Sequence, residues 1–396
     1  MLLKIFLSIA VSTVFLNAAQ YDILSKTKRG IIENEKKQNK KNSDILKFDW
    51  INPITGSYSH TISTQTSPSQ TIDNLSISLN QPIFRSGGIY YAIKYANANR
   101  EFLKFATSLS EKSLLFNAYT ILLNLKNLNL SIKKQKLLIK NAVINITVKK
   151  EQYLKGLIDS SFLDNAIFNK NSLDIGLLNM QSSKVDLEKQ FKVISSLNYK
   201  TIKLPHLKLL NLSKFLKSNL VLKDSMANIK QTNYLKKMTI SKYLPTVSLF
   251  ANYNSSRISY IGTVHDSYKQ YGINISMPLF DINRGKNIQL QKLKYLKSKL
   301  EMIDKKHQEK ELYKSIVEKI KIYHKKIALA KKQEHLYASL LSSTKDLYKA
   351  GEKTVYDVDT MQNSLRSTKI DKYIYQNDID LLLLSLYAHL DDKQKL

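Results

Sequence analysis

Hydrophobic and polar residues alternate along four short segments of the chain, which is typical of β-strands with one apolar and one polar face. In the clearest case Leu75, Ile77 and Leu79 alternate with serine and asparagine. The first two segments are separated by Ser67-Pro68-Ser69, which predicts a turn between them. The pattern predicts two pairs of strands, at about 54–66 and 71–83 and at about 246–257 and 268–279.

A second pattern, apolar residues that recur every three or four positions, follows each pair of strands. This spacing is typical of the seam between antiparallel helices. Proline is absent between Pro82 and Pro205 and again after Pro278, so nothing interrupts a helix there. We therefore predict two long helical hairpins, at about 87–198 and 285–390, that turn at Gly156 and Gly351. The seam residues are Phe102, Phe105, Leu109, Phe116, Tyr119 and Leu123 in the first and Ile316, Ile320, Tyr323, Ile327 and Ala330 in the second.

These two units repeat one another. Gln81-Pro82-Ile83-Phe84 is echoed 196 positions later by Met277-Pro278-Leu279-Phe280, and Tyr153-Leu154-Lys155-Gly156 is echoed 195 positions later by Tyr348-Lys349-Ala350-Gly351. Two pairs of matching segments with nearly the same separation along the chain indicate a tandem repeat. We predict a first repeat at 20–199, which opens with an N-terminal helix, a linker at 200–217, and a second repeat at 218–396, which opens with a helix at 218–243. The predicted strand-to-helix junctions contain Pro82, Phe84, Gly87 and Gly88 in the first repeat and Pro278, Phe280 and Gly285 in the second.

The N-terminus predicts export. Lys4 precedes an apolar run from Ile5 to Leu16, and Ala18-Ala19 supplies the small residues of a cleavage site. Residues 1–19 are therefore predicted to be a cleaved signal peptide. The alternative, a membrane anchor, needs a longer apolar run. The chain has no cysteine, which excludes disulfides and thiolate metal sites.

The formal net charge is +30, and it is carried almost entirely by lysine. Arginine, the residue that best suits phosphate and base recognition, occurs only six times, so the charge favours solvated helix faces over a nucleic-acid partner. No nucleophile elbow, phosphate-binding glycine loop or dinucleotide motif is present, and the seven histidines have no metal-ligand spacing. We predict that the protein is not an enzyme and has no cofactor or metal.

The strands have two possible environments. Each is about long enough for a tilted transmembrane strand of roughly 9–11 residues, but a soluble antiparallel sheet alternates in the same way. Four strands cannot close a barrel, and an open edge in lipid leaves backbone groups unpaired. If these strands lie in a membrane, the protein must form an oligomer in which sheets join edge to edge.

The chain resembles the TolC-like outer-membrane efflux channels over nearly all of its mature length. The resemblance rests on Tyr243-Leu244-Pro245 before a strand, the Pro-hydrophobic-Phe segments after strands, and the Tyr-x-x-Gly helix break followed by an aspartate, in this order twice. It implies a mainly α fold in which coiled-coil hairpins form a periplasmic tunnel and four antiparallel strands contribute to a trimeric, twelve-stranded transmembrane β-barrel. It also implies a passive export duct in the Gram-negative outer membrane, with a large periplasmic portion. Such a duct serves a periplasmic adaptor and an inner-membrane pump in tripartite efflux or type I secretion.

The resemblance also implies a gate at the hairpin turns. Tyr348 takes the place of the family's tyrosine, Lys353 of its basic residue and Asp357 of its first acid, while Thr360 occupies the second acidic position beside Asp359. Asp357, repeated by threefold symmetry, would gather negative charge, favour cations and raise its own pKa. Alternatively, Asp357 caps a helix, and we predict that role for Asp164. The corresponding positions of the first repeat are Tyr153, Asp159, Phe162 and Asp164.

Two other functions are compatible with parts of the pattern. A periplasmic or surface coiled-coil scaffold with a small soluble sheet would need no pore. A basic nucleic-acid-binding rod in the cytoplasm would retain its N-terminus and bind DNA in a salt-sensitive way.

Overall fold

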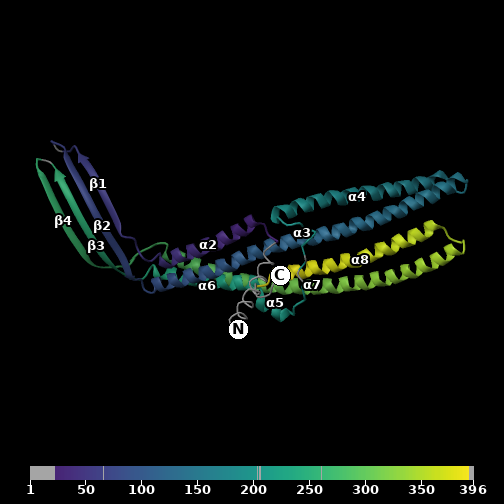
Figure 1. The fold of residues 1–396 in the computed structure, drawn as a ribbon. Coiled ribbons are helices and arrows are strands. Elements are labelled where there is room, and N and C mark those ends of the chain that lie inside the picture. Colours follow the sequence, from purple (N-terminus) through teal and green to yellow (C-terminus); the bar gives the residue numbers. More distant parts are fainter. Residues whose placement is uncertain (1–22, 66, 203, 205–206, 260, 392–396) are drawn as a thin grey trace, which may run out of the picture. The chain divides into compact units, whose positions relative to one another are not determined.

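The computed structural model describes residues 23–391 except 66, 203, 205–206 and 260. The predicted signal peptide, residues 1–19, lies outside this range. Long helices and one antiparallel sheet make up the described part, which confirms the predicted fold class of a mainly α chain with a small β part (Figure 1). No helix in the described part is both long enough and apolar enough to span a membrane.

The helices are long where proline is absent. The helices of the first repeat are α2 (Lys26–Phe48), α3 (Gly88–Leu154) and α4 (Ser160–Ile194). Those of the second are α6 (Leu220–Ser241), α7 (Arg284–Lys349) and α8 (Val355–Tyr387), and the short helix α5 (Leu212–Ser218) precedes them. The α3–α4 and α7–α8 pairs are the two hairpins (Figure 1).

Helix α5 lies largely within the segment predicted as a linker. The Asn211 side chain accepts a hydrogen bond from the Lys214 backbone N–H at 2.8 Å and so caps the helix. The Phe215 side chain is fully buried, which holds this short helix against the core of unit 1, to which the helix belongs. The segment is therefore a structured element as well as a connection.

The sheet has the order β1-β2-β3-β4 with every neighbouring pair antiparallel. The strands are β1 (Thr55–Ser63), β2 (Gln70–Phe84), β3 (Thr246–Ser259) and β4 (Thr263–Ser276). Strand β4 starts five residues before the predicted position, because Thr263–Ser267 pair with Ser255–Ser259 although they do not alternate in polarity. Strands β1 and β4 are the sheet's two edges.

The chain forms two compact units that do not coincide with the sequence repeats. Unit 1 contains the described residues up to Ile32, the segment Leu109–Leu220 and the described residues from Gln308 onward. Unit 2 contains Glu33–Ser108 and Val221–His307. Each unit therefore draws on both repeats. Both predicted helix seams contribute to the core of unit 1, through Tyr119, Leu123, Ile316 and Ile320.

Candidate functional site at the two hairpin turns

Both hairpins turn through the same backbone motif. The Gly156 N–H donates to the Tyr153 carbonyl at 2.9 Å, and the Leu157 N–H donates to the Gln152 carbonyl at 2.9 Å. This pair of bonds is a Schellman motif, which satisfies carbonyls that the end of a helix would leave free. Gly156 has φ 69°, a left-handed conformation that favours glycine.

The second turn reproduces this arrangement. The Gly351 N–H donates to the Tyr348 carbonyl at 3.0 Å, and the Glu352 N–H donates to the Leu347 carbonyl at 2.9 Å. Gly351 has φ 81°. No atom beyond the neighbouring residues would lie within 4 Å of a Cβ at either glycine. The Tyr-x-x-Gly motif therefore reflects backbone conformation and not lack of space.

Asp357 belongs to a capping box at the start of α8. Thr354 is the N-cap: the Asp357 N–H donates to Thr354 Oγ1 at 3.3 Å, and the Thr354 N–H donates to Asp357 Oδ2 at 2.9 Å. Hydrogen bonds from the Thr354 backbone and hydroxyl lower the pKa of Asp357, and the charge of Lys353 adds to this effect. In the single chain Asp357 is thus a stabilised carboxylate. The raised pKa expected from the sequence applies to three copies of Asp357 brought together, which a single chain does not contain.

The first turn is capped by a different aspartate from the one predicted. Asp159 is the N-cap of α4, since its Oδ1 accepts from the Ser161 N–H at 3.0 Å. Hydrogen bonds from Ser161, and a further one from Ser160, lower the pKa of Asp159. The prediction that Asp164 caps the helix is wrong: Asp164 lies four residues inside α4, beyond the first turn whose N–H groups need a cap.

The other predicted gate residues lie around these turns without a shared hydrogen-bond network in the described part of the chain. Tyr348, Lys353 and Asp359 are exposed. The Thr360 carbonyl accepts a hydrogen bond from the α3 residue Asn141, which ties this position to the neighbouring helix. In the first hairpin Tyr153 and Phe162 are exposed, and the Lys149 ammonium lies 5.8 Å from the Phe162 ring centroid.

Sequence reasoning missed three polar contacts that join α3 to α8. Asn127 donates to Asp378 at 2.9 Å, Lys134 to Asp371 at 2.7 Å and Asn141 to Ser364 at 3.3 Å. Both sets of residues step by seven, in opposite directions along the chain. This is the register of two antiparallel helices in a heptad arrangement. The seven-residue spacing of these polar residues could have indicated that they share one face of each helix. The pairing of α3 with α8, however, cannot be read from either helix alone.

The strand-to-helix junction of the first repeat is a tight turn. Ser86 has φ 45° and Gly87 φ 83°, and the Ser86 hydroxyl donates to the Pro245 carbonyl at 2.7 Å. Pro82 is buried and Phe84 ends β2 after a register shift. A Cβ at Gly88 would lie 2.7 Å from Ser241 Oγ, so any larger residue there would displace the Ser241 side chain. In the second repeat no atom beyond the neighbouring residues lies within 4 Å of the position that a Cβ at Gly285 would take, and Phe280 is 88% exposed.

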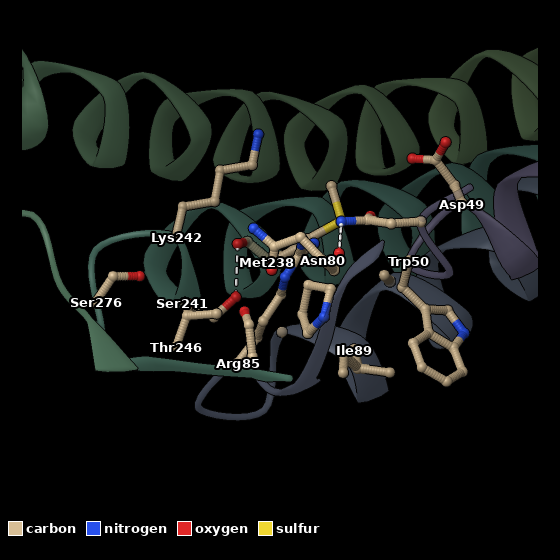
Figure 2. A pocket seen from close by; sticks show the side chains of 15 residues that line it. Asp49, Trp50, Asn80, Arg85, Ile89, Met238, Ser241, Lys242, Thr246 and Ser276 are labelled. Carbon is tan, nitrogen blue, oxygen red and sulfur yellow. Dashed lines mark hydrogen bonds between the residues drawn. The ribbon is translucent and has the colours of Figure 1, made fainter. Parts of the chain in front are cut away.

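A cavity of about 520 Å³ adjoins this junction within unit 2. Residues from the segment after α2, the start of α3, the end of α6 and strands β2, β3 and β4 line it (Figure 2). Across the described residues, no group of three or more His, Cys, Asp or Glu side chains is arranged to hold a metal ion.

Comparison with solved structures identifies the fold. The chain superposes on the Campylobacter jejuni CmeC outer membrane channel with a TM-score of 0.77 and 16% identity, over 96% of this chain and 86% of that one. The chain has the TolC-like fold. For the outer membrane protein VceC of Vibrio cholerae the TM-score is 0.74 at 13% identity, over 95% of this chain and 96% of that one.

The open-state Neisseria gonorrhoeae MtrE outer membrane channel, also of TolC-like fold, gives a TM-score of 0.66 at 12% identity, over 94% of this chain and 88% of that one. No protein-family model and no curated protein matches the chain. The TolC-like fold is therefore preserved at a level of identity where sequence similarity alone carries little information. The resemblance read from short motifs is confirmed at the level of the fold.

Proposed function

We propose that this chain is one subunit of a passive channel in the outer membrane of a Gram-negative bacterium. The observation that carries the proposal is the likeness of almost the whole chain to outer membrane channels such as CmeC, and not of one domain alone. In this proposal the chain provides a duct and performs no catalysis. An inner-membrane pump and a periplasmic adaptor would deliver the substrate, and the pump would select it.

The two faces of the sheet support a membrane location. One face carries Leu249, Tyr271, Ile273 and Ile275, which are 42–83% exposed. The opposite face carries serine and asparagine, and on it the Ser57 and Ser76 hydroxyls lie 2.7 Å apart. An exposed apolar face is costly in water and suits lipid, while the polar face suits an aqueous lumen.

The open edges of the sheet support a trimer. Strands β1 and β4 have no neighbour on their outer sides within the described chain. In a membrane these edges would leave backbone N–H and C=O groups unsatisfied. Three copies joined β4 to β1 would supply twelve strands and close the barrel, which removes the edges.

The helices of unit 1 carry exposed apolar stripes that support the same assembly. On α7, Ile322, Leu329 and Leu336 recur every seven residues and are 52–58% exposed. On α4, Phe168 and Ile175 have the same spacing and are 72% and 60% exposed. A heptad stripe of this kind fits a neighbouring helix, so we propose that α4 and α7 of adjacent copies pack together to close a periplasmic tunnel.

The gate is proposed at the hairpin turns. Asp357 would line the entrance in three copies, with Asp359 beside it, while Tyr348 and Lys353 would bond to neighbouring hairpins when the channel is closed. The exposure of Tyr348, Lys353 and Asp359 supports this role, since these side chains are available to a partner. The capping box fixes the backbone from which Asp357 projects.

Cross-linking tests the assembly directly, because the natural chain has no cysteine. Ser57 in β1 and Tyr268 in β4 share one row across the sheet and are exposed at opposite edges. Because closure of a barrel staggers its strands, Ser57→Cys is combined in turn with a cysteine at Tyr268 and at the other exposed positions of the same face of β4. In native membranes treated with a bifunctional maleimide, at least one of these double variants should give covalent trimers on a denaturing gel. Each single variant is the control and should remain monomeric. Double variants that all give only monomers would contradict the proposal.

A further inference from the structure

The cavity at the strand-to-helix junction has the chemistry of an anion site. Its walls supply two cations, Arg85 and Lys242, and the polar side chains of Asn52, Asn80 and Ser248, among others. Figure 2 shows Arg85 extending from the loop after β2 toward Asn80 and Met238, with Lys242 at one margin. The volume of about 520 Å³ lies within the roughly 300–1,000 Å³ of small-molecule sites.

Arg85 is a half-buried cation whose side chain has no partner among the described residues. Other arginines do have partners: Arg100 lies 3.7 Å from Asp44, and the Arg284 guanidinium lies 5.7 Å from the centroid of the Tyr243 ring. A guanidinium that is partly withdrawn from water without a counter-charge is unfavourable. An anion in the cavity would relieve this cost and match the forked geometry of the guanidinium.

The start of α3 adds to the positive potential. Gly88 and Ile89, the first residues of this 67-residue helix, line the cavity, and the first turn of the helix contains no acidic residue. The Gly88 N–H already donates to the Arg85 carbonyl at 2.7 Å, so the start of α3 offers an anion the Ile89 N–H and the positive end of the helix dipole. Asp49 is the one carboxylate among the lining residues, and in Figure 2 it lies on the side opposite Lys242.

We propose that this cavity binds a phosphate group, held by the Arg85 guanidinium and the start of α3, with Lys242 as a flexible cation at the margin. The phosphate is that of a phospholipid headgroup or of a small free phosphate compound. This inference goes beyond the proposed channel function and does not depend on it, because the site lies within unit 2 of a single chain.

The chain carries its own reporter for this site. Trp50 is the only tryptophan in the sequence, and it lines the cavity. The experiment is a titration of the full-length, detergent-solubilised protein with inorganic phosphate at constant ionic strength, followed by Trp50 fluorescence. We expect a saturable change in emission that an equal ionic strength of sodium chloride does not produce.

Variants assign the binding to named groups. Arg85→Gln should weaken phosphate binding at least about tenfold, since a hydrogen bond to a charged group contributes about 1.5–3 kcal/mol. Lys242→Gln should weaken binding less, and Asp49→Asn should strengthen it by removing a like charge. The matched controls are Arg100→Gln in α3 and Lys236→Gln in α6, where the Lys236 ammonium lies over the Tyr295 ring outside the cavity. Both controls should bind phosphate as the natural protein does.

A second titration distinguishes the sources of the phosphate. Short-chain phosphatidylglycerol that binds more tightly than inorganic phosphate, again through Arg85, would identify a lipid headgroup, whereas equal or weaker binding would identify a free phosphate. If neither probe gives a saturable change, or if Arg85→Gln binds both as tightly as the controls, the proposal is wrong. If circular dichroism shows that Arg85→Gln does not fold, the other two variants test the proposal. Lys242→Gln should weaken phosphate binding and Asp49→Asn should strengthen it.

Discussion

Lys134 on α3 and Asp371 on α8 form an ion pair in which the lysine Nζ lies 2.7 Å from one carboxylate oxygen and 2.9 Å from the other. The two side chains are 34% and 22% exposed and belong to different sequence repeats. The pair is the middle one of three polar contacts at seven-residue intervals, so it fixes the register of α3 against α8. A shift by one turn would separate all three.

Loss of one partner should therefore destabilise unit 1. We expect Asp371→Asn to lower the free energy of unfolding by about 1–2 kcal/mol, because Lys134 would keep its charge in a partly buried position without its counter-ion. Thermal unfolding in detergent, followed by circular dichroism, measures this. The control is Lys314→Met, which removes an exposed ion pair to Glu311 and should change stability by less than about 0.5 kcal/mol. Equal effects in both variants would show that the α3–α8 pair has no special role.

The glycines of the chain predict opposite outcomes for two glycine-to-alanine changes. Gly351→Ala places a Cβ on a residue with φ 81° and should destabilise the protein by about 1 kcal/mol. Gly30 lies within α2, and no atom outside the local helix backbone lies within 4 Å of the position that an added Cβ would take. Gly30→Ala should therefore stabilise the protein by about 0.5–1 kcal/mol. Denaturant titration of both variants tests this, and a stabilising Gly351→Ala would contradict the Schellman assignment.

The capping role of Asp357 and the role of its charge can be tested separately. In the proposed channel, Asp357→Ala should reduce block by divalent cations at the entrance, because it removes a ring of carboxylates. Thr354→Ala is the matched control: it removes the N-cap side chain but keeps the acid, so it should lower stability and leave block unchanged. Single-channel recording with and without divalent cations measures both. If the two variants behave alike, Asp357 acts only through the capping box.

Asp224 on α6 predicts a pH dependence. Burial raises its pKa to about 6, and its Oδ1 is buried without a hydrogen-bond partner. Because the folded pKa lies above the unfolded value near 3.9, the cost of ionisation is absent below about pH 4 and fully present above about pH 6. This group therefore lowers stability as pH rises through that window. Asp224→Asn should unfold at a higher temperature than the natural protein at pH 7.5, and the difference should vanish near pH 4. A difference that is the same at both pH values would contradict this origin.

The sequence predicts the elements of this fold better than it predicts the contacts between them. The turns at Gly156 and Gly351 are predictable because only a few residues tolerate the left-handed backbone there. The N-cap of α4 is harder to place, and the sequence favours Asp164 over Asp159. The first residue of α4 is set by the length of the turn, which the sequence leaves open by several positions.

Other features depend on partners that are distant in sequence. The start of β4 at Thr263 is fixed by hydrogen bonds to β3 and not by alternation of polarity. The pairing of Lys134 with Asp371 requires knowledge that α3 lies beside α8. The cavity at Arg85 combines residues from five helices and strands and from the segments that join them, and these residues form no sequence motif. These features arise from tertiary packing, which a single helix or strand pattern does not record.

The central claim is that the chain forms a transmembrane duct, and conductance tests it most directly. Protein extracted with detergent from outer membranes should insert into a planar lipid bilayer and give discrete, reproducible single-channel currents from a trimeric species. A chain that is recovered as a water-soluble monomer, and that leaves the bilayer without conductance, would contradict the account.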